Sequence, residues 1–187
     1  FIIVESSFLH SGKKKKLNFN INNFIKFKDK IIYVSIDELP SNLKSYDEND
    51  NELLKNKKIL DNSVLRENYQ RNFCFDNLKK FSEEDLVLIN DLDEIPNLKN
   101  FRYNFKITIF KQKMFYYKLN LEFPNFTWMG SKICKIKDLI SPQWLRNLKF
   151  GKRPWWRIDK FRLNYILKDG GWHFCNLKSP EKLLYKY

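Results

Sequence analysis

Residues 85–96 join a hydrophobic run to a group of acids without a spacer. Four apolar residues in succession, Leu-Val-Leu-Ile, follow Asp85, which is typical of a strand buried on both faces. Asp91-Leu-Asp93-Glu94 comes directly after this run, and Pro96 ends it. The segment therefore predicts two carboxylates at the carboxyl end of a buried strand, where open α/β sheets bind ligands.

Asp91 and Asp93 are separated by a single residue, so their negative charges repel each other. A divalent cation or an added proton would relieve that repulsion. Carboxylate oxygens suit Mg²⁺ or Mn²⁺, which keep open positions for the phosphate oxygens of a substrate. One interpretation of the motif is thus a metal-assisted nucleotide site, and the other is a solvated acidic turn.

The rest of the chain alternates strand and helix patterns in its first half and then shows adjacent strand patterns. This order predicts an α/β class with a mixed central sheet flanked by helices, in one domain over residues 1–187. The polar stretch 41–58 is expected to be a loop. The expected strands are 1–5, 31–36, 85–90, 105–110, 114–121, 128–135 and 172–177, and the expected helices are 63–81 with Ser63 as N-cap, 143–148, 157–167 and one opening at 179–181.

The net charge of +13, from 35 lysines and arginines against 22 acids, makes nucleic acid or an anionic membrane surface an obvious partner to consider. However, 28 of these cations are Lys, whereas recognition of phosphates and base edges favours Arg. The chain also has 21 Asn and no Ala, which indicates an AT-rich coding sequence and a solvated lysine-rich surface. We expect no nucleic-acid partner, with a basic nucleic-acid-binding module as the alternative function.

The cysteines Cys74, Cys134 and Cys175 are odd in number and lack metal-ligand spacing. They predict neither a disulfide framework nor a structural zinc site, and they suit a reducing compartment as small buried residues. No apolar run approaches the roughly 18 to 20 residues that cross a bilayer. These features favour a cytoplasmic protein of bacterial or viral origin without a transmembrane segment in this chain.

Several segments together resemble glycosyltransferase family 17, the family of the β-1,4-mannosyl-glycoprotein β-1,4-N-acetylglucosaminyltransferase. Residues 85–96 are similar to its metal-binding segment. The other similar segments are Val4-Glu5-Ser6 with Gly12-Lys13-Lys14-Lys15, the helix bearing Arg66, Glu67, Gln70 and Arg71, and Gly171-Trp172-His173-Phe174 with Pro180-Glu181-Lys182 and Lys186. The resemblance covers nearly the whole chain.

The resemblance implies an A-type glycosyltransferase fold that transfers N-acetylglucosamine or a related sugar from a UDP-sugar, with inversion, to a glycan acceptor. It implies Mn²⁺ or Mg²⁺ as cofactor and UDP-GlcNAc as donor. Against the family's pattern, the N-terminal strand and helix are missing from this sequence, so the resemblance implies a domain truncated at both ends. A Golgi location would follow only if a missing N-terminal anchor exists, and an inactive nucleotide- or glycan-binding remnant is a further alternative.

By the same resemblance, Asp93 binds the cation, with Asp91 acting directly or through water. His173 is either a further metal or phosphate contact or a structural histidine. Inversion needs a general base on the acceptor hydroxyl. Glu94 is the nearest candidate, although it could only brace the turn.

Donor contacts are expected from Glu5, Ser6, Lys13, Lys15, Arg66, Arg71 and Asp91. Lys13 and Lys15 belong to a run of four lysines whose alternative is simple solvation. Trp172 and Trp128 are expected to stack on the acceptor sugar, with core packing as the alternative for Trp128. Trp155 and Trp156, beside basic residues, are expected to pack in the core or at the acceptor site.

Overall fold

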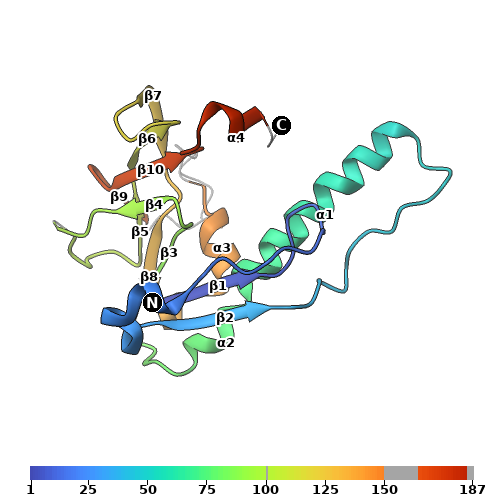
Figure 1. Ribbon diagram of the computed structural model, residues 1–187. Coiled ribbons are helices and arrows are strands. Elements are labelled where there is room, and N and C mark those ends of the chain that lie inside the picture. The colour runs from blue at the N-terminus through green and yellow to red at the C-terminus, as the bar shows by residue number, and fades with distance from the viewer. Residues whose placement is uncertain (100, 150–163, 185–187) are drawn as a thin grey trace, which may run out of the picture. The chain divides into compact units, whose positions relative to one another are not determined.

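The computed structural model describes residues 1–99, 101–149 and 164–184, and the chain divides into two compact units (Figure 1). Unit 1 comprises Phe1–Lys80 and Ser141–Gln143, and unit 2 comprises Phe81–Ile140 and Trp144–Tyr187. Strands and helices occur in both units, and two of the three sheets are mixed. The α/β class predicted from the sequence is thus confirmed, and the single domain over 1–187 stays a prediction.

Unit 1 is built on two parallel strands, β1 (Ile2–Ser6) and β2 (Ile32–Ile36). The 3-10 helix η1 (Ile21–Lys30) lies in the connection between them. The long helix α1 (Glu52–Asn72) packs against β1, where Gln70 Nε2 donates a hydrogen bond of 3.2 Å to the Val4 carbonyl (Figure 1). The short helix α2 (Phe75–Leu78) follows it. The strands at 1–5 and 31–36 are thereby confirmed to within one residue.

Helix α1 begins well before the expected start. Its N-cap is Asn51, whose side chain accepts a hydrogen bond of 2.8 Å from Leu54 N, so the prediction of Ser63 as N-cap was wrong. The first half of the helix mixes lysines with exposed leucines such as Leu53 and Leu60, and no apolar stripe marks it. The loop predicted over 41–58 was therefore wrong from residue 52 onward, because these residues lack an apolar stripe and only the cap at Asn51 indicates a helix.

Unit 2 contains two four-stranded sheets, ordered β4-β10-β6-β7 and β3-β8-β5-β9. The β10–β6 and β5–β9 pairs are parallel and the other pairs are antiparallel. The first sheet comprises β4 (Glu94–Pro96), β10 (Gly171–Cys175), β6 (Gln112–Tyr116) and β7 (Glu122–Trp128). The second comprises β3 (Leu86–Ile89), β8 (Lys132–Lys135), β5 (Ile107–Phe110) and β9 (Asn164–Leu167).

The core of unit 2 centres on β5, in which all four residues are buried. Ile133 and Cys134 of β8 add to this core, as does Leu145 of α3 (Pro142–Asn147). Each fully buried Ile, Leu or Phe contributes roughly 1.5–3 kcal/mol relative to an exposed side chain. The remaining helices are η2 (Ile136–Asp138) and α4 (Pro180–Leu184), and α3 and α4 match the helices expected at 143–148 and 179–181.

The strand expected at 85–90 forms as β3, but it is not buried on both faces. Leu86 is 43% exposed, whereas Val87 is buried. The strand expected at 128–135 forms only as β8 over its second half, because β7 ends at Trp128 and β8 begins at Lys132. Residues 129–131 between them belong to neither strand.

Two further differences concern the C-terminal part and β4. The expected helix at 157–167 was wrong over Asn164–Leu167, which form β9 beside β5, and its residues 157–163 lie outside the described part of the chain. The strand β4 was not expected, because Pro96 indicated the end of a strand pattern. Its pairing with β10 explains why three residues with a proline can form a strand at the edge of a sheet.

Candidate functional site

The pairing of β4 with β10 brings the acidic segment beside the histidine segment. The strands run antiparallel, with Glu94 opposite His173 and Ile95 opposite Trp172. The Phe174 amide also donates a hydrogen bond of 2.9 Å to the Asp93 carbonyl, which fixes the start of β4. Two motifs far apart in the sequence therefore meet through backbone hydrogen bonds within unit 2.

Asp93 and His173 are in direct contact. His173 Nε2 lies 3.3 Å from Asp93 Oδ2, and the aspartate side chain is 47% exposed while that of the histidine is 5% exposed. The imidazole ring stacks on Trp128, with ring centroids 4.5 Å apart. On the same face of β10, Cys175 Sγ lies 3.4 Å from His173 Nε2. The three side chains offer an oxygen, a nitrogen and a sulfur atom within 4.8 Å of one another.

Asp91 and Asp93 both line an open pocket of about 760 Å³. Lys178 adds a positive charge to its lining, and Ile95 and Phe174 add apolar surface. All of the lining residues belong to unit 2; they are Asp91, Leu92, Asp93, Ile95, Leu119, Phe174, Asn176, Leu177 and Lys178. The pocket thus combines two carboxylates, one cation and an apolar wall, which is the kind of lining that small charged ligands use.

Asp91 and Glu94 share a cation that the sequence did not indicate. Arg146 Nη2 lies 2.6 Å from Asp91 Oδ2 and 2.9 Å from Glu94 Oε1, and Arg146 Nη1 lies 2.8 Å from Glu94 Oε2. Glu94 is only 3% exposed, and it also accepts hydrogen bonds from Trp128 Nε1 at 2.6 Å and Ser131 Oγ at 2.9 Å. A buried carboxylate needs such partners. Its role as general base stays a prediction.

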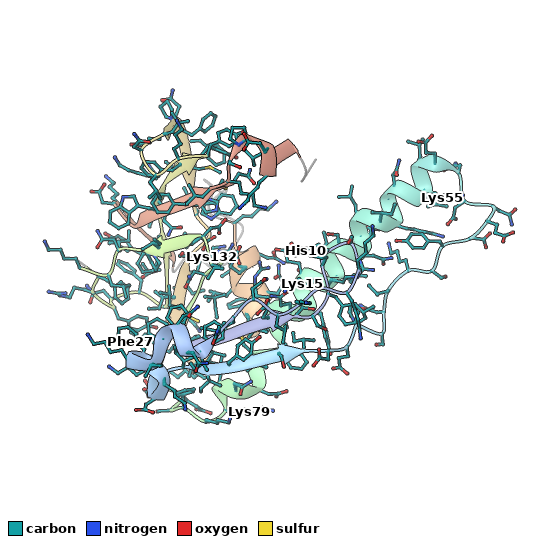
Figure 2. All side chains as sticks on the ribbon, viewed as in Figure 1. His10, Lys15, Phe27, Lys55, Lys79 and Lys132 are labelled. Atoms are coloured by element: carbon teal, nitrogen blue, oxygen red, sulfur yellow. The ribbon has the colours of Figure 1, made fainter. Side chains whose placement is uncertain are left out.

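Two residues of the β7–β8 region allow this arrangement. Gly130 lies so close to the network that a β-carbon there would be 2.0 Å from Glu94 Oε1 and 2.5 Å from Arg146 Nη1. Lys132, labelled in Figure 2, donates from its buried Nζ to the carbonyls of Arg146 and, at 2.8 Å, Leu148. These carbonyls end helix α3, where a cation is favourable. Lys132 therefore fixes the backbone that carries Arg146.

The predicted donor contacts of unit 1 form a cluster of their own around Glu5. Its carboxylate accepts hydrogen bonds from Lys15 Nζ at 2.6 Å, the Asn18 and Phe19 amides at 2.8 and 3.0 Å, and Tyr33 Oη at 3.1 Å. Burial alone would raise the pKa of Glu5, but these donors outweigh it and hold the pKa at about 2, below the usual 4.5. Glu5 thereby fixes the loop after β1, on which Figure 2 labels His10 and Lys15.

The other predicted residues of unit 1 are also held by local contacts. Arg66 Nη1 donates to the His10 carbonyl at 2.8 Å, and Arg71 pairs with Glu67 at 2.8 Å. Ser6 Oγ accepts from the Phe8 amide at 3.1 Å, and the Lys13 carbonyl accepts from the Leu9 amide. These contacts bring Glu5, Ser6, Lys13, Lys15 and Arg66 onto or against one loop of unit 1, while Arg71 contacts Gln143.

The two tryptophans predicted as acceptor contacts have different surroundings. Trp128 stacks on His173 and donates to Glu94, so it supports the groups behind the pocket. Trp172 is 40% exposed and, by its register, shares a sheet face with Ile95, which lines the pocket. Trp155, Trp156 and the adjacent basic residues lie outside the described part of the chain.

Sequence reasoning missed Arg146, Ser131, Gly130 and Cys175. Only Cys175 had a usable signal, because residues two apart in a strand share a face, and His173-Phe174-Cys175 follows that spacing. Cys134 behaves as expected, since burial raises the pKa of its thiol to about 12. Burial also raises the pKa of Cys74. Cys134 is thus buried as the sequence predicted, whereas Cys74 and Cys175 are only partly buried.

Comparison of the chain with protein-family models, curated proteins and solved structures found no match. The resemblance to glycosyltransferase family 17 therefore stays a prediction. Among the helices of the described residues, none has the length and hydrophobicity needed to cross a bilayer. The functional conclusions below consequently depend on the geometry of unit 2 and on the motifs quoted above.

Proposed function

We propose that this protein is an inverting, metal-dependent glycosyltransferase of the A-type fold. It transfers N-acetylglucosamine or a related sugar from a UDP-sugar to a hydroxyl group of a glycan. The observation that carries this proposal is the contact of 3.3 Å between Asp93 and His173 at a pocket that Asp91 and Asp93 both line. The resemblance to family 17 through the residues of these same segments adds support.

The side chains at this pocket fit a divalent cation. Two ligands of one ion, each about 2.1 Å from it, lie roughly 3 to 3.5 Å apart, and the Asp93 and His173 atoms are 3.3 Å apart. The imidazole favours Mn²⁺ over Mg²⁺, because Mg²⁺ prefers an all-oxygen shell. Such an ion would stabilise the negative charge that develops on the leaving diphosphate. Asp93 and His173 would hold it, with Asp91 beside them.

The neighbouring charges give Asp93 a distinct role among the three acids. Arg146 forms ion pairs with both Asp91 and Glu94, whereas Asp93 is half exposed and faces the pocket beside His173. Lys178 lies in the same lining, where an ammonium group can bind a phosphate oxygen. Together they provide groups for both charges of a cation–diphosphate pair.

The acceptor is proposed to bind along the face of the sheet that carries Trp172. The flat ring of an exposed tryptophan stacks on the apolar face of a sugar, and Trp172 shares its sheet face with the pocket residues Ile95 and Phe174. The donor contacts expected from Lys13 and Lys15 stay predictions from the resemblance alone. Trp128 is proposed to orient His173 rather than to touch the sugar.

Calorimetry with UDP and UDP-GlcNAc, with and without Mn²⁺, tests this proposal. We expect the protein to bind both ligands only when the cation is present, and Asp93→Asn to abolish binding. The matched control is Asp169→Asn, which makes the same change at an exposed aspartate with a positive φ of 53°, a conformation that Asn also tolerates. This control should bind like the unchanged protein.

The outcomes also separate the alternatives. Cation-dependent binding followed by release of UDP in the presence of glycan acceptors supports the enzyme, whereas binding without turnover identifies an inactive remnant. Failure of both ligands to bind with Mn²⁺ present would overturn the proposal. Equal binding by Asp93→Asn would show that the nucleotide site lies elsewhere.

A further inference from the structure

Cys175 contributes a ligand type that a site for Mg²⁺ or Mn²⁺ does not need. Its Sγ atom lies 3.4 Å from His173 Nε2, the same nitrogen that lies 3.3 Å from Asp93 Oδ2. Asp93, His173 and Cys175 thus converge around one point with three different donor atoms. Among the described residues, these three are the group of His, Cys and acidic side chains that could hold a metal ion.

We propose that Asp93, His173 and Cys175 form a three-ligand site that selects Zn²⁺ over Mg²⁺ and Mn²⁺. This inference rests on the proposed function, because the same Asp93 and His173 hold the ion. The new element is the identity of the ion that the site prefers. Zinc bound there would exclude the other cations from the pocket. The affinity of the protein for a nucleotide would then depend on which ion occupies the site.

The spacing of the donor atoms fits tetrahedral zinc. With bonds of about 2.0–2.2 Å to oxygen and nitrogen and about 2.3 Å to sulfur, a tetrahedral ion separates its O and N ligands by roughly 3.3 Å and its N and S ligands by roughly 3.6 Å. The corresponding distances here are 3.3 and 3.4 Å. All three donor atoms lie within 4.8 Å of one another, so only small side-chain adjustments would complete the geometry.

The fold holds these ligands in place without the ion. His173 and Cys175 lie two residues apart on one face of β10, and β10 pairs with β4 on one side and β6 on the other. The His173 ring is nearly fully buried and stacks on Trp128, whose Nε1 is itself bound by Glu94. A ring fixed in this way does not have to be ordered when the metal binds.

The donor types decide which ion is preferred. A thiolate is a soft ligand that selects zinc, whereas Mg²⁺ and Mn²⁺ prefer carboxylate, carbonyl and water oxygens. Three protein ligands also leave one position of a tetrahedral ion open, as in zinc sites that act on a substrate. Of the three ligands, Asp93 lines the pocket, whereas His173 and Cys175 lie on the other face of β10 from the pocket residue Phe174.

Two measurements on the full chain test the site without any nucleotide. The affinity for Zn²⁺ is measured by competition with a chromophoric chelator, in the presence of a phosphine reductant that keeps the thiols reduced. Co²⁺ is then added in place of zinc, because a cobalt–thiolate bond gives a near-ultraviolet charge-transfer band and tetrahedral cobalt gives strong visible bands. We expect one equivalent of either ion to bind and both kinds of band to appear.

Cys175→Ser removes the sulfur with little change in size, and Asp93→Asn removes the exposed carboxylate charge without touching the core. Each variant should weaken zinc binding by more than the roughly 10- to 100-fold that loss of an outer-shell partner costs, and Cys175→Ser should abolish the thiolate band. Cys74→Ser in unit 1 is the matched control and should leave affinity and spectrum unchanged. Far-ultraviolet circular dichroism identifies any variant that fails to fold.

A cobalt spectrum without the thiolate band would overturn the proposal, as would unchanged zinc affinity in folded Cys175→Ser. Failure of the proposed function has a different signature. Zinc binding that depends on Cys175 while UDP binds with no cation would keep the metal site and reject the transferase. Mn²⁺-dependent UDP binding with no zinc preference would keep the transferase and reject the site.

Discussion

Three adjacent carboxylates of one short segment have three different environments. Asp91 is paired with Arg146, Glu94 is buried under five donors, and Asp93 is half exposed beside His173. The differences come from residues distant in sequence and not from the segment itself. The guanidinium of Arg146 pairs with two of the acids, whereas the third faces the pocket beside His173.

Replacing Arg146 by Met should therefore strongly destabilise unit 2. The variant keeps a long side chain but leaves the buried carboxylate of Glu94 without its cation, which typically costs about 3–5 kcal/mol. Urea unfolding followed by circular dichroism measures the loss. Arg102→Met, at an exposed arginine, should change the free energy of unfolding by no more than about 0.5 kcal/mol. Equal effects of the two substitutions would contradict the role of Arg146.

Gly130→Ala should also destabilise the fold, because the added carbon would meet Glu94 Oε1 at 2.0 Å and Trp128 Nε1 at 2.2 Å. Both atoms belong to the buried hydrogen-bond network of Glu94, whose side chains cannot move away. Overpacking of this kind lowers the free energy of unfolding by about 1–3 kcal/mol. The same unfolding measurement applies. An unchanged midpoint would show that the network can shift to accept a methyl group.

At this scale, the sequence predicted Asp91, Asp93 and His173 as candidates because each belongs to a recognisable local motif. It could not predict that Arg146 pairs with these acids, because Arg146 lies far from them along the chain and belongs to no recognisable motif. Nor could it predict that Trp128 would stack on His173, since that contact depends on where β7 ends. Long-range partners of this kind follow from the pairing of strands and not from spacing.

Among the elements, those with a clear hydrophobic period or cap were predicted well. Strands β1, β2 and β10 and the short helix α3 form where the patterns indicated. The start of α1 was missed because its lysine-rich first half has no apolar stripe, and 164–167 were taken for helix because their strand character depends on pairing with β5. A hydrophobic pattern predicts a helix or strand when its apolar residues face a core. It does not predict the element where strand pairing or helix capping determines the structure.

The loop after β1 gives an element-scale prediction about pH. The pKa of Glu5 is depressed from 4.5 to about 2, so its charged form stabilises unit 1 above pH 4.5 and this contribution disappears as the pH falls from 4.5 toward 2. Glu5→Gln should lower stability at neutral pH and should reduce the loss of stability over that acid range. Thermal melting at a series of pH values measures both effects.

The control for this prediction is Glu48→Gln, which removes a carboxylate from an exposed position of the same unit. It should melt like the unchanged protein across the whole series. Identical profiles for Glu5→Gln and Glu48→Gln would mean that the hydrogen bonds from Lys15, Asn18, Phe19 and Tyr33 do not hold the loop.

For the whole molecule, the charge of +13 remains the strongest competing observation. Many of the lysines are engaged in pairs with acids, such as Lys58 with Asp50 and Lys135 with Glu84, and so part of the charge is compensated locally. The α/β class could be predicted from the order of the elements. The division into two compact units could not, because it depends on which strands pair.

Any binding to DNA or RNA should accordingly be weak, independent of sequence and strongly reduced by salt. Fluorescence anisotropy with labelled duplex and single strands, repeated over a range of salt concentrations, measures this. Asp93→Asn should leave such binding unchanged while it abolishes binding of UDP. Strong, salt-dependent binding that does not change in Asp93→Asn, together with no binding of UDP, would instead favour the nucleic-acid-binding module.

The central claim is that Asp93 and His173 hold a divalent cation that in turn binds a nucleotide diphosphate. Electron paramagnetic resonance of Mn²⁺ tests it most directly, because the sharp signal of the free ion diminishes when the ion is bound. In the presence of UDP, we predict that the unchanged protein and Asp169→Asn diminish the signal and that Asp93→Asn does not. A signal that the unchanged protein leaves intact, or that Asp93→Asn diminishes equally, would contradict the claim.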